Sequence, residues 1–160
     1  MSRLGQLTAS SSQLINKRGI YLGRRATKVH VALYRRSGGR LGGHIPGWPG
    51  ARIALVDHVG AKSGIGRTSP VMYFEDGDAI VVMASKAGQP TNPAWFHNLM
   101  ANPETTVQTG STVREVRARV AGDEERDRLW SRFVAIYPGS EFYRRNAQGR
   151  QIPIVVLEPR

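Results

Sequence analysis

The chain has 160 residues, with 23 Lys and Arg against 12 Asp and Glu, and it contains no Cys. This length fits one domain, and a hydrophobic share of 40% with a charged share of 22% is typical of a globular protein. No apolar run approaches the ~20 residues of a membrane-spanning helix. The absence of Cys excludes disulfides, thiolate metal sites and Cys nucleophiles.

The positive charge is concentrated toward the N-terminus. Residues 1–50 contain nine basic residues and no acidic residue, and the first acid is Asp57. The remaining residues carry 14 basic and 12 acidic side chains, so +9 of the net charge of +11 lies in the first third. The sequence therefore predicts a basic N-terminal extension over 1–50 and a nearly neutral domain over 51–160.

Residues 14–36 have the pattern of an amphipathic helix. Apolar side chains recur at helical spacing at Leu22, Ala26, Val29 and Leu33. Basic side chains lie largely off that face at Arg24, Arg25, Lys28, Arg35 and Arg36. Two interpretations stay open: the helix packs on the domain with its charges in water, or it lies peripherally on an anionic membrane. The N-terminus lacks the apolar run of a signal peptide, so we expect a cytoplasmic protein, with the inner face of the cell membrane as the surface for such an association.

The rest of the chain predicts a mainly β domain. Strands are expected at 52–56, 69–75, 79–84, 105–109, 113–120 and 152–157, and helices at 93–100 and 123–137. Pro93 is expected as the first helical residue, with Asn92 as its N-cap, and the Gly- and Pro-rich residues 37–50 as a loop. Strands and helices do not alternate as in a Rossmann sheet. This order favours a mostly antiparallel barrel with helices outside it.

Common catalytic and metal motifs are missing. Residues 60–68 contain Gly, Lys and Ser, but not in the order of a Walker A loop, and no GxSxG elbow occurs. The histidines at 30, 44, 58 and 97 do not have metal-ligand spacing. We therefore predict no metal site, and we interpret each histidine as a satisfied or exposed side chain.

Three segments suit an anionic ligand. The first, 60–70, combines Gly-rich backbone with Lys62, Arg67 and the hydroxyls of Ser63, Thr68 and Ser69; such a loop offers N–H groups and fixed positive charge to phosphate or carboxylate. The second is 85–88, directly after a strand. The third is 92–99, which opens a helix whose N-terminus attracts anions and whose Trp95 could wall a planar ligand.

Together these segments resemble the deazaflavin-dependent nitroreductase family. Its motifs match Gly60-Ala-Lys-Ser-Gly64, Arg67-Thr-Ser-Pro70, Asp76-Gly-Asp78, Ala84-Ser-Lys-Ala-Gly88, Asn92-Pro-Ala-Trp-Phe-His-Asn-Leu99 and Ala101-Asn-Pro103. The resemblance covers roughly 51–160. It implies a split β-barrel of the FMN-binding type, and an F420-dependent oxidoreductase that transfers a hydride from reduced F420 to an electron-poor acceptor such as a quinone, an enone or a nitro compound.

The resemblance also implies a set of site residues. F420 carries a phosphodiester and an oligoglutamate tail, and Lys62, Arg67 and Lys86 would bind these charges. The cofactor set is Lys62, Ser63, Gly64, Arg67, Thr68, Ser69, Pro70, Met72, Ser85, Lys86, Ala87, Gly88, Ala94 and Trp95, and the acceptor set is Met72, Ser85, Tyr137 and Tyr143. Ser140 and Met72 stand where tyrosines would be expected. No single catalytic residue is predicted.

Two other functions remain as alternatives. An FMN- or haem-binding split barrel would share the predicted fold. A basic nucleic-acid-binding module would use the N-terminal extension, but no RRM, KH or helix-turn-helix signature appears there, so nucleic acid is not a predicted partner. The sequence does not specify the oligomeric state.

Overall fold

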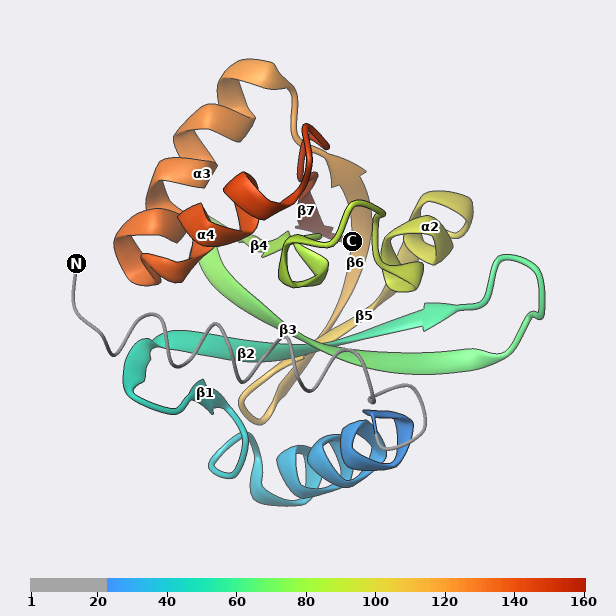
Figure 1. Cartoon of the computed structure of the whole chain (residues 1–160). Helices are drawn as coiled ribbons and strands as arrows, with labels where there is room; N and C mark the ends of the chain where they lie inside the picture. The colour runs from blue at the N-terminus through green and yellow to red at the C-terminus, as the bar shows by residue number, and fades with distance from the viewer. Residues whose placement is uncertain (1–22) are drawn as a thin grey trace.

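The structure is a computed structural model that describes residues 23–160 (Figure 1). The strands are β1 (His44–Ile45), β2 (Trp48–Val59), β3 (Gly66–Asp76), β4 (Ala79–Met83), β5 (Glu104–Thr109), β6 (Thr112–Val120) and β7 (Ile154–Pro159). The helical elements are an N-terminal helix over 23–37, a 3₁₀ turn η1 (Lys86–Gly88), α2 (Ala94–Ala101), α3 (Asp123–Ile136) and α4 (Gly139–Asn146).

Six antiparallel strands close into a barrel. The hydrogen-bonded order is β2-β3-β4-β7-β6-β5, and β5 returns to β2 through the pairs Leu55↔Gln108 and Val56↔Val107. The short β1 adds to β2 outside this ring. Closure removes the free sheet edges on which unpaired backbone groups would remain. The predicted mainly β barrel with flanking helices is confirmed.

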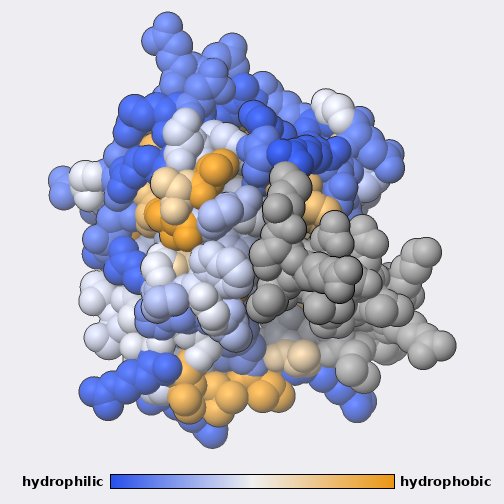
Figure 2. Space-filling model, turned by 60° about the vertical axis from the view of Figure 1, so that its left-hand side comes forward, coloured by the Kyte–Doolittle hydropathy of each residue, from blue (hydrophilic) through white to orange (hydrophobic). Residues whose placement is uncertain are grey.

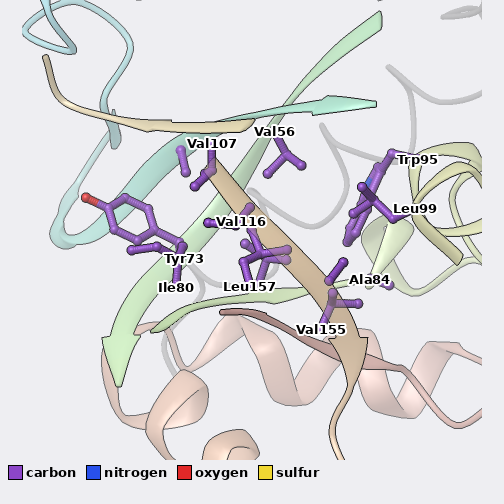
Figure 3. Packing of buried hydrophobic residues seen from close by; sticks show 13 residues of the cluster. Val56, Tyr73, Ile80, Ala84, Trp95, Leu99, Val107, Val116, Val155 and Leu157 are labelled. Atoms are coloured by element: carbon purple, nitrogen blue, oxygen red, sulfur yellow. The ribbon is translucent and has the colours of Figure 1, made fainter. Parts of the chain in front are cut away.

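The barrel has a core inside it and a second core on its outer surface. Ile80 and Val82 of β4 pack with Val155 and Leu157 of β7 in the inner core, and Figure 3 shows Ile80, Val155 and Leu157 inside the barrel. Alternate residues of the same strands point outward and pack under α3, where the ring of Phe133 is buried. Successive side chains of a strand face opposite sides, so strands buried on both faces appear in the sequence as continuous apolar runs.

The helix over 23–37 packs on the barrel through a face that differs from its predicted apolar face. Tyr34 is buried; its hydroxyl donates to Ile53 O at 2.7 Å and accepts from Gly110 N at 2.9 Å. Val29 and Leu33 are 60% and 45% exposed, and Figure 2 shows a hydrophobic strip between hydrophilic groups along the lower edge, where this helix lies in Figure 1. The predicted segment 14–22, with Leu22, lies outside the described residues.

Three local predictions need correction. Residues 37–50, expected as a loop, include β1 and the start of β2 at Trp48. Pro93 occupies the N-cap position of α2 rather than its first turn, and Asn92 instead accepts a hydrogen bond from a distant arginine. The sequence also gave no sign of α4, which begins at Gly139 directly after α3. A Cβ at Gly139 would lie 2.5 Å from the Tyr137 ring, so glycine allows this tight step between the two helices.

Candidate functional site

A cavity of about 260 Å³ opens between the barrel and the η1 and α4 segments. Its lining contains eight of the predicted site residues: Pro70, Met72, Ser85, Lys86, Ala87, Trp95, Tyr137 and Tyr143. The other four lining residues, which the sequence did not predict, are Ile45, Ile53, Val71 and Met83. These are apolar strand residues that look like core in a sequence. Their position at the end of the barrel follows only from how the strands close.

Two tyrosines stand at one side of the cavity. The rings of Tyr137 and Tyr143 lie 6.2 Å apart, and Trp48 packs its ring edge-on against Tyr137 at 5.4 Å. Burial, followed by the neighbouring Tyr137 hydroxyl, raises the pKa of Tyr143. This phenol therefore keeps its proton at neutral pH. It can donate a hydrogen bond to an acceptor in the cavity, but it cannot act as a base there.

A groove of about 1080 Å³ runs between the N-terminal helix and strands β2 and β3, and Trp95 lines both this groove and the cavity. Its lining includes the predicted residues Arg67, Thr68, Ser69, Ala94 and Trp95. Three cations of the N-terminal helix, which the sequence did not predict as site residues, also line it: Arg24, Lys28 and Arg35. The sequence feature that could have indicated them is a basic helix without acidic residues next to a nearly neutral domain. The sequence pattern alone suggested water or a membrane as the surroundings of these charges.

Asp57 connects the helix to the groove wall. Its Oδ1 accepts from Arg35 Nη2 at 2.8 Å and from the Thr68 hydroxyl, and its Oδ2 accepts from the Thr106 hydroxyl at 2.7 Å. The hydroxyl proton of Thr68 is thus already donated to Asp57 and is not available to a ligand. Among residues 23–160, Arg67 has no carboxylate partner within salt-bridge distance, in contrast to Arg35. Arg67 is therefore the cation of this wall that is available to a ligand.

A buried histidine orients Ser69. The Asn98 amide accepts from Ala61 N at 2.9 Å through Oδ1, so its Nδ2 donates to His58 Nδ1 at 3.0 Å. His58 Nε2 then carries the proton and donates to Ser69 Oγ at 3.0 Å. Burial is the main cause that lowers the pKa of His58, and the positive charge of Arg67 is the second, so the ring stays neutral. The Ser69 hydroxyl keeps its own proton to offer to an anion.

The remaining predicted residues line neither space. Lys62, Ser63 and Gly64 form the exposed turn between β2 and β3, beyond the end of the groove at Val59. Gly88 is buried under α4: its φ is +76°, and an added Cβ would lie 2.8 Å from Tyr143 O. Glycine is required here because the η1 segment packs too closely against α4 for a side chain to fit. The assignment of all four to the cofactor remains a prediction.

An apolar cavity with hydroxyl donors, which shares the side chain of Trp95 with a cationic groove, defines a barrel protein suited to a planar ligand with an anionic extension. The chain belongs to the F420H2-dependent quinone reductase family, whose family model matches residues 26–159. The F420H2-dependent quinone reductase Rv1261c of Mycobacterium tuberculosis is 35% identical over 142 residues, which cover 88% of this chain and 94% of that protein. The chain is therefore an F420H2-dependent reductase with reduced F420 as its cofactor.

Solved structures agree with this membership. An F420H2-dependent reductase, FDR-A, is 37% identical with a TM-score of 0.61, and the match covers 66% of this chain and 93% of that one. A domain-swapped dimer is 32% identical with a TM-score of 0.64, covering 84% and 96%. HutZ, a haem storage protein from Vibrio cholerae, shares only the fold, with 11% identity, a TM-score of 0.51 and 84% and 90% coverage. The comparisons thus favour F420 over the FMN and haem alternatives.

Proposed function

We propose that the chain reduces quinones with F420H2, and that the cofactor spans both spaces of the site. The observation that carries the proposal is that Trp95 lines both the cavity and the groove, so the two spaces border the same side chain. One space has the apolar walls that a planar ring needs, and the other has the cations that a polyanionic tail needs. When bound, F420 supplies the hydride, and the protein orients the ring and the acceptor.

The residues present fit both parts of the cofactor. Pro70, Met72 and Trp95 give the cavity apolar surfaces on which a flat ring can lie. Arg67 and the helix cations Arg24 and Lys28 give the groove charges that bind phosphate and carboxylate groups. Ser69 adds a hydroxyl whose proton is free because His58 donates to its oxygen. The proposed positions therefore match apolar surface with the ring and positive charge with the tail.

The acceptor would lie beside the two tyrosines. A quinone gains a hydride and a proton on reduction, and negative charge develops on its oxygen. A protonated Tyr143 can stabilise that oxygen by donating a hydrogen bond, and Tyr137 lies next to it. Ser140 does not line the cavity and is fully buried, so it cannot supply the hydroxyl that a tyrosine there would present. Because the family and the M. tuberculosis relative are named for quinone reduction, we place quinones ahead of nitro compounds.

Oxidation of reduced F420 by a panel of acceptors tests this proposal. Purified protein is mixed with F420H2 and with quinones, enones or nitroimidazoles of similar size, and the return of the F420 absorbance is followed. Quinones should be reduced fastest. If nitro compounds or enones are consumed faster at matched concentrations, the proposed acceptor is wrong. If F420 is not bound, the assignment of the whole site fails.

We further propose that the N-terminal helix associates with anionic membranes. Within residues 23–160 no helix has the length and apolar character to cross a bilayer. The exposed Val29 and Leu33, however, lie on a helix that carries Arg25 and Arg36. Apolar groups would enter the interface and each cation near lipid would contribute about 1 kcal/mol. This would bring the site close to lipid-dissolved quinones.

Vesicle sedimentation with the full chain tests this association. The protein should pellet with anionic vesicles at low salt and be released at high salt. Val29→Glu with Leu33→Glu should abolish pelleting, whereas Val120→Glu, at another exposed valine at the end of β6, should not. Equal pelleting of the two variants would exclude the helix as the lipid-binding surface.

A further inference from the structure

Arg150 reaches into the segment that carries the η1 side of the cavity. Its guanidinium donates from Nε to Gln89 O at 2.9 Å, from Nη1 to Ala84 O at 3.1 Å and to Asn92 Oδ1 at 2.6 Å, and from Nη2 to Ser85 O at 2.7 Å. All four acceptors belong to 84–92, which follows β4 and precedes α2. A residue near the C-terminus thus holds together a segment more than fifty positions earlier in the chain.

This segment has a backbone conformation that its own residues disfavour. Lys86 and Ala87 have φ values of 47° and 52°, in the left-handed region that side chains with a Cβ rarely adopt, and Gly88 follows with 76°. Its local backbone hydrogen bonds run only from Gly88 N to Ser85 O and from Gln89 N to Lys86 O. Such a conformation persists only where surrounding contacts impose it. Arg150 supplies contacts of that kind at both ends of the turn.

The chemistry of the contact explains why an arginine is needed. Within the described residues Arg150 has no carboxylate partner, and each of its acceptors is a neutral carbonyl or amide oxygen. The planar fork of N–H donors can reach several carbonyls at once, whereas a lysine offers its donors from a single point. A role in folding alone would not require these hydrogen bonds to be made next to residues that line the cavity, namely Ser85, Lys86 and Ala87.

We propose that Arg150 is a positioning residue for the cofactor and acceptor site. It does not line the cavity itself; it acts by holding Ser85, Lys86 and Ala87 in the conformation that forms one cavity wall. The inference rests on the proposed function, because it takes this cavity as the place of the F420 ring. It predicts that loosening the segment weakens cofactor binding while the barrel stays intact.

Four variants separate positioning from folding. Arg150→Met removes all four hydrogen bonds, Arg150→Lys keeps the charge but loses the fork, and Asn92→Ala removes one acceptor only. Arg145→Met, at an exposed arginine of α4 that makes none of the four hydrogen bonds to the segment, removes the same charge and serves as the control. If Arg150→Met does not fold, the lysine and Asn92 variants keep the proposal testable.

Two readouts are taken on each folded variant. The first is amide hydrogen exchange at Gly88 and Gln89, whose N–H groups form the local bonds of the segment, with the β4–β7 amides as an internal reference. The second is F420 affinity by fluorescence titration. We expect faster exchange at Gly88 and Gln89 with unchanged β4–β7 exchange. The dissociation constant should rise about tenfold in Arg150→Met, less in Arg150→Lys, less again in Asn92→Ala, and not in Arg145→Met.

The outcomes distinguish this inference from the proposed function. If the wild type does not bind F420, the proposed function fails, and exchange alone still reports whether Arg150 holds the segment. If the wild type binds F420 and the Arg150 variants bind it equally well, the positioning role is overturned, whatever the exchange rates. Equal loss of protection in the segment and in β4–β7 would also overturn it, because the residue would then act on the whole fold.

Discussion

The cavity and the groove adjoin each other but are held by different kinds of contact. The cavity wall formed by η1 depends on hydrogen bonds from Arg150 and on close packing of Gly88 under α4. The groove is held by contacts that water reaches: the ion pair between Arg35 of the helix and Asp57 of β2 joins its two sides, and these side chains are 48% and 39% exposed. Salt screens exposed charges but leaves buried hydrogen bonds almost unaffected. We therefore expect the cavity to determine ring position and the groove to determine a salt-dependent part of the affinity.

The largest expected effect comes from removing positive charge at the groove. Lys62→Ala with Arg67→Ala should weaken F420 binding by about 2–4 kcal/mol, since each charged hydrogen bond contributes about 1.5–3 kcal/mol with partial redundancy. Arg67→Ala alone should produce most of the loss, because Arg67 lines the groove and Lys62 lies in the turn beyond it. Titrations at two salt concentrations measure both effects. An unchanged dissociation constant in the double variant would remove this assignment.

Gly88→Ala tests the packing that holds the cavity wall. The new Cβ would meet Tyr143 O at 2.8 Å and would sit on a residue with φ +76°, so we expect a loss of about 2–3 kcal/mol in unfolding free energy. Gly64→Ala is the matched control: its φ is +67°, but nothing lies within 4 Å of the added Cβ. It should cost only about 1 kcal/mol. Equal losses in urea unfolding would show that strain, rather than packing under α4, explains Gly88.

Tyr137→Phe distinguishes the acceptor side from the cofactor side. Removing one neutral hydrogen-bonding hydroxyl should lower turnover with quinones about three- to tenfold, while the F420 dissociation constant stays near that of the wild type. The same variant is measured by steady-state kinetics and by cofactor titration. A matching loss in both would mean that this tyrosine contacts the cofactor and that the acceptor pocket lies elsewhere.

The smallest expected effect is the pH dependence contributed by His58. Its pKa is lowered in the folded protein from the ordinary value of 6.5, so below that pH the unfolded chain binds a proton that the folded protein does not. The unfolding free energy should therefore fall as pH decreases from 6.5 toward the folded-state pKa. Urea unfolding at pH values from roughly 7.5 to 5.5, on either side of the ordinary value, measures this change. His58→Gln should lose this pH-dependent component of the unfolding free energy. If the variant and the wild type have the same pH profile, His58 does not take up a proton on unfolding.

Local patterns in the sequence were enough to predict the barrel, and the family resemblance implied eight of the residues that line the cavity. Alternating and continuous apolar runs gave the strands, and the Asp76-Gly77 turn joined β3 to β4. The family resemblance that implied those residues rests on motifs that are contiguous in the chain, at 60–70, 84–88 and 92–99. Such features depend on neighbours within a few positions, so a sequence can show them.

Contacts between distant segments could not be predicted in this way. Arg150 appears as one more charge between Gly149 and Gln151, and nothing in its neighbourhood points to carbonyls of the η1 segment. His58 appears as an isolated histidine until β2 and α2 place Asn98 beside it. The apolar stripe of the N-terminal helix suggested its packing face, but Tyr34 anchors the helix through hydrogen bonds that hydrophobic periodicity does not detect.

The most direct test of the two-part site compares F420 with a deazaflavin that lacks the phosphodiester and oligoglutamate tail. Both are titrated into the wild-type protein by fluorescence, at low salt and at high salt. We predict that both bind, that F420 binds more tightly at low salt, and that only the affinity for F420 falls as salt is added. Equal affinities, or equal salt dependence for the two compounds, would contradict the assignment of the ring to the cavity and the tail to the cationic groove.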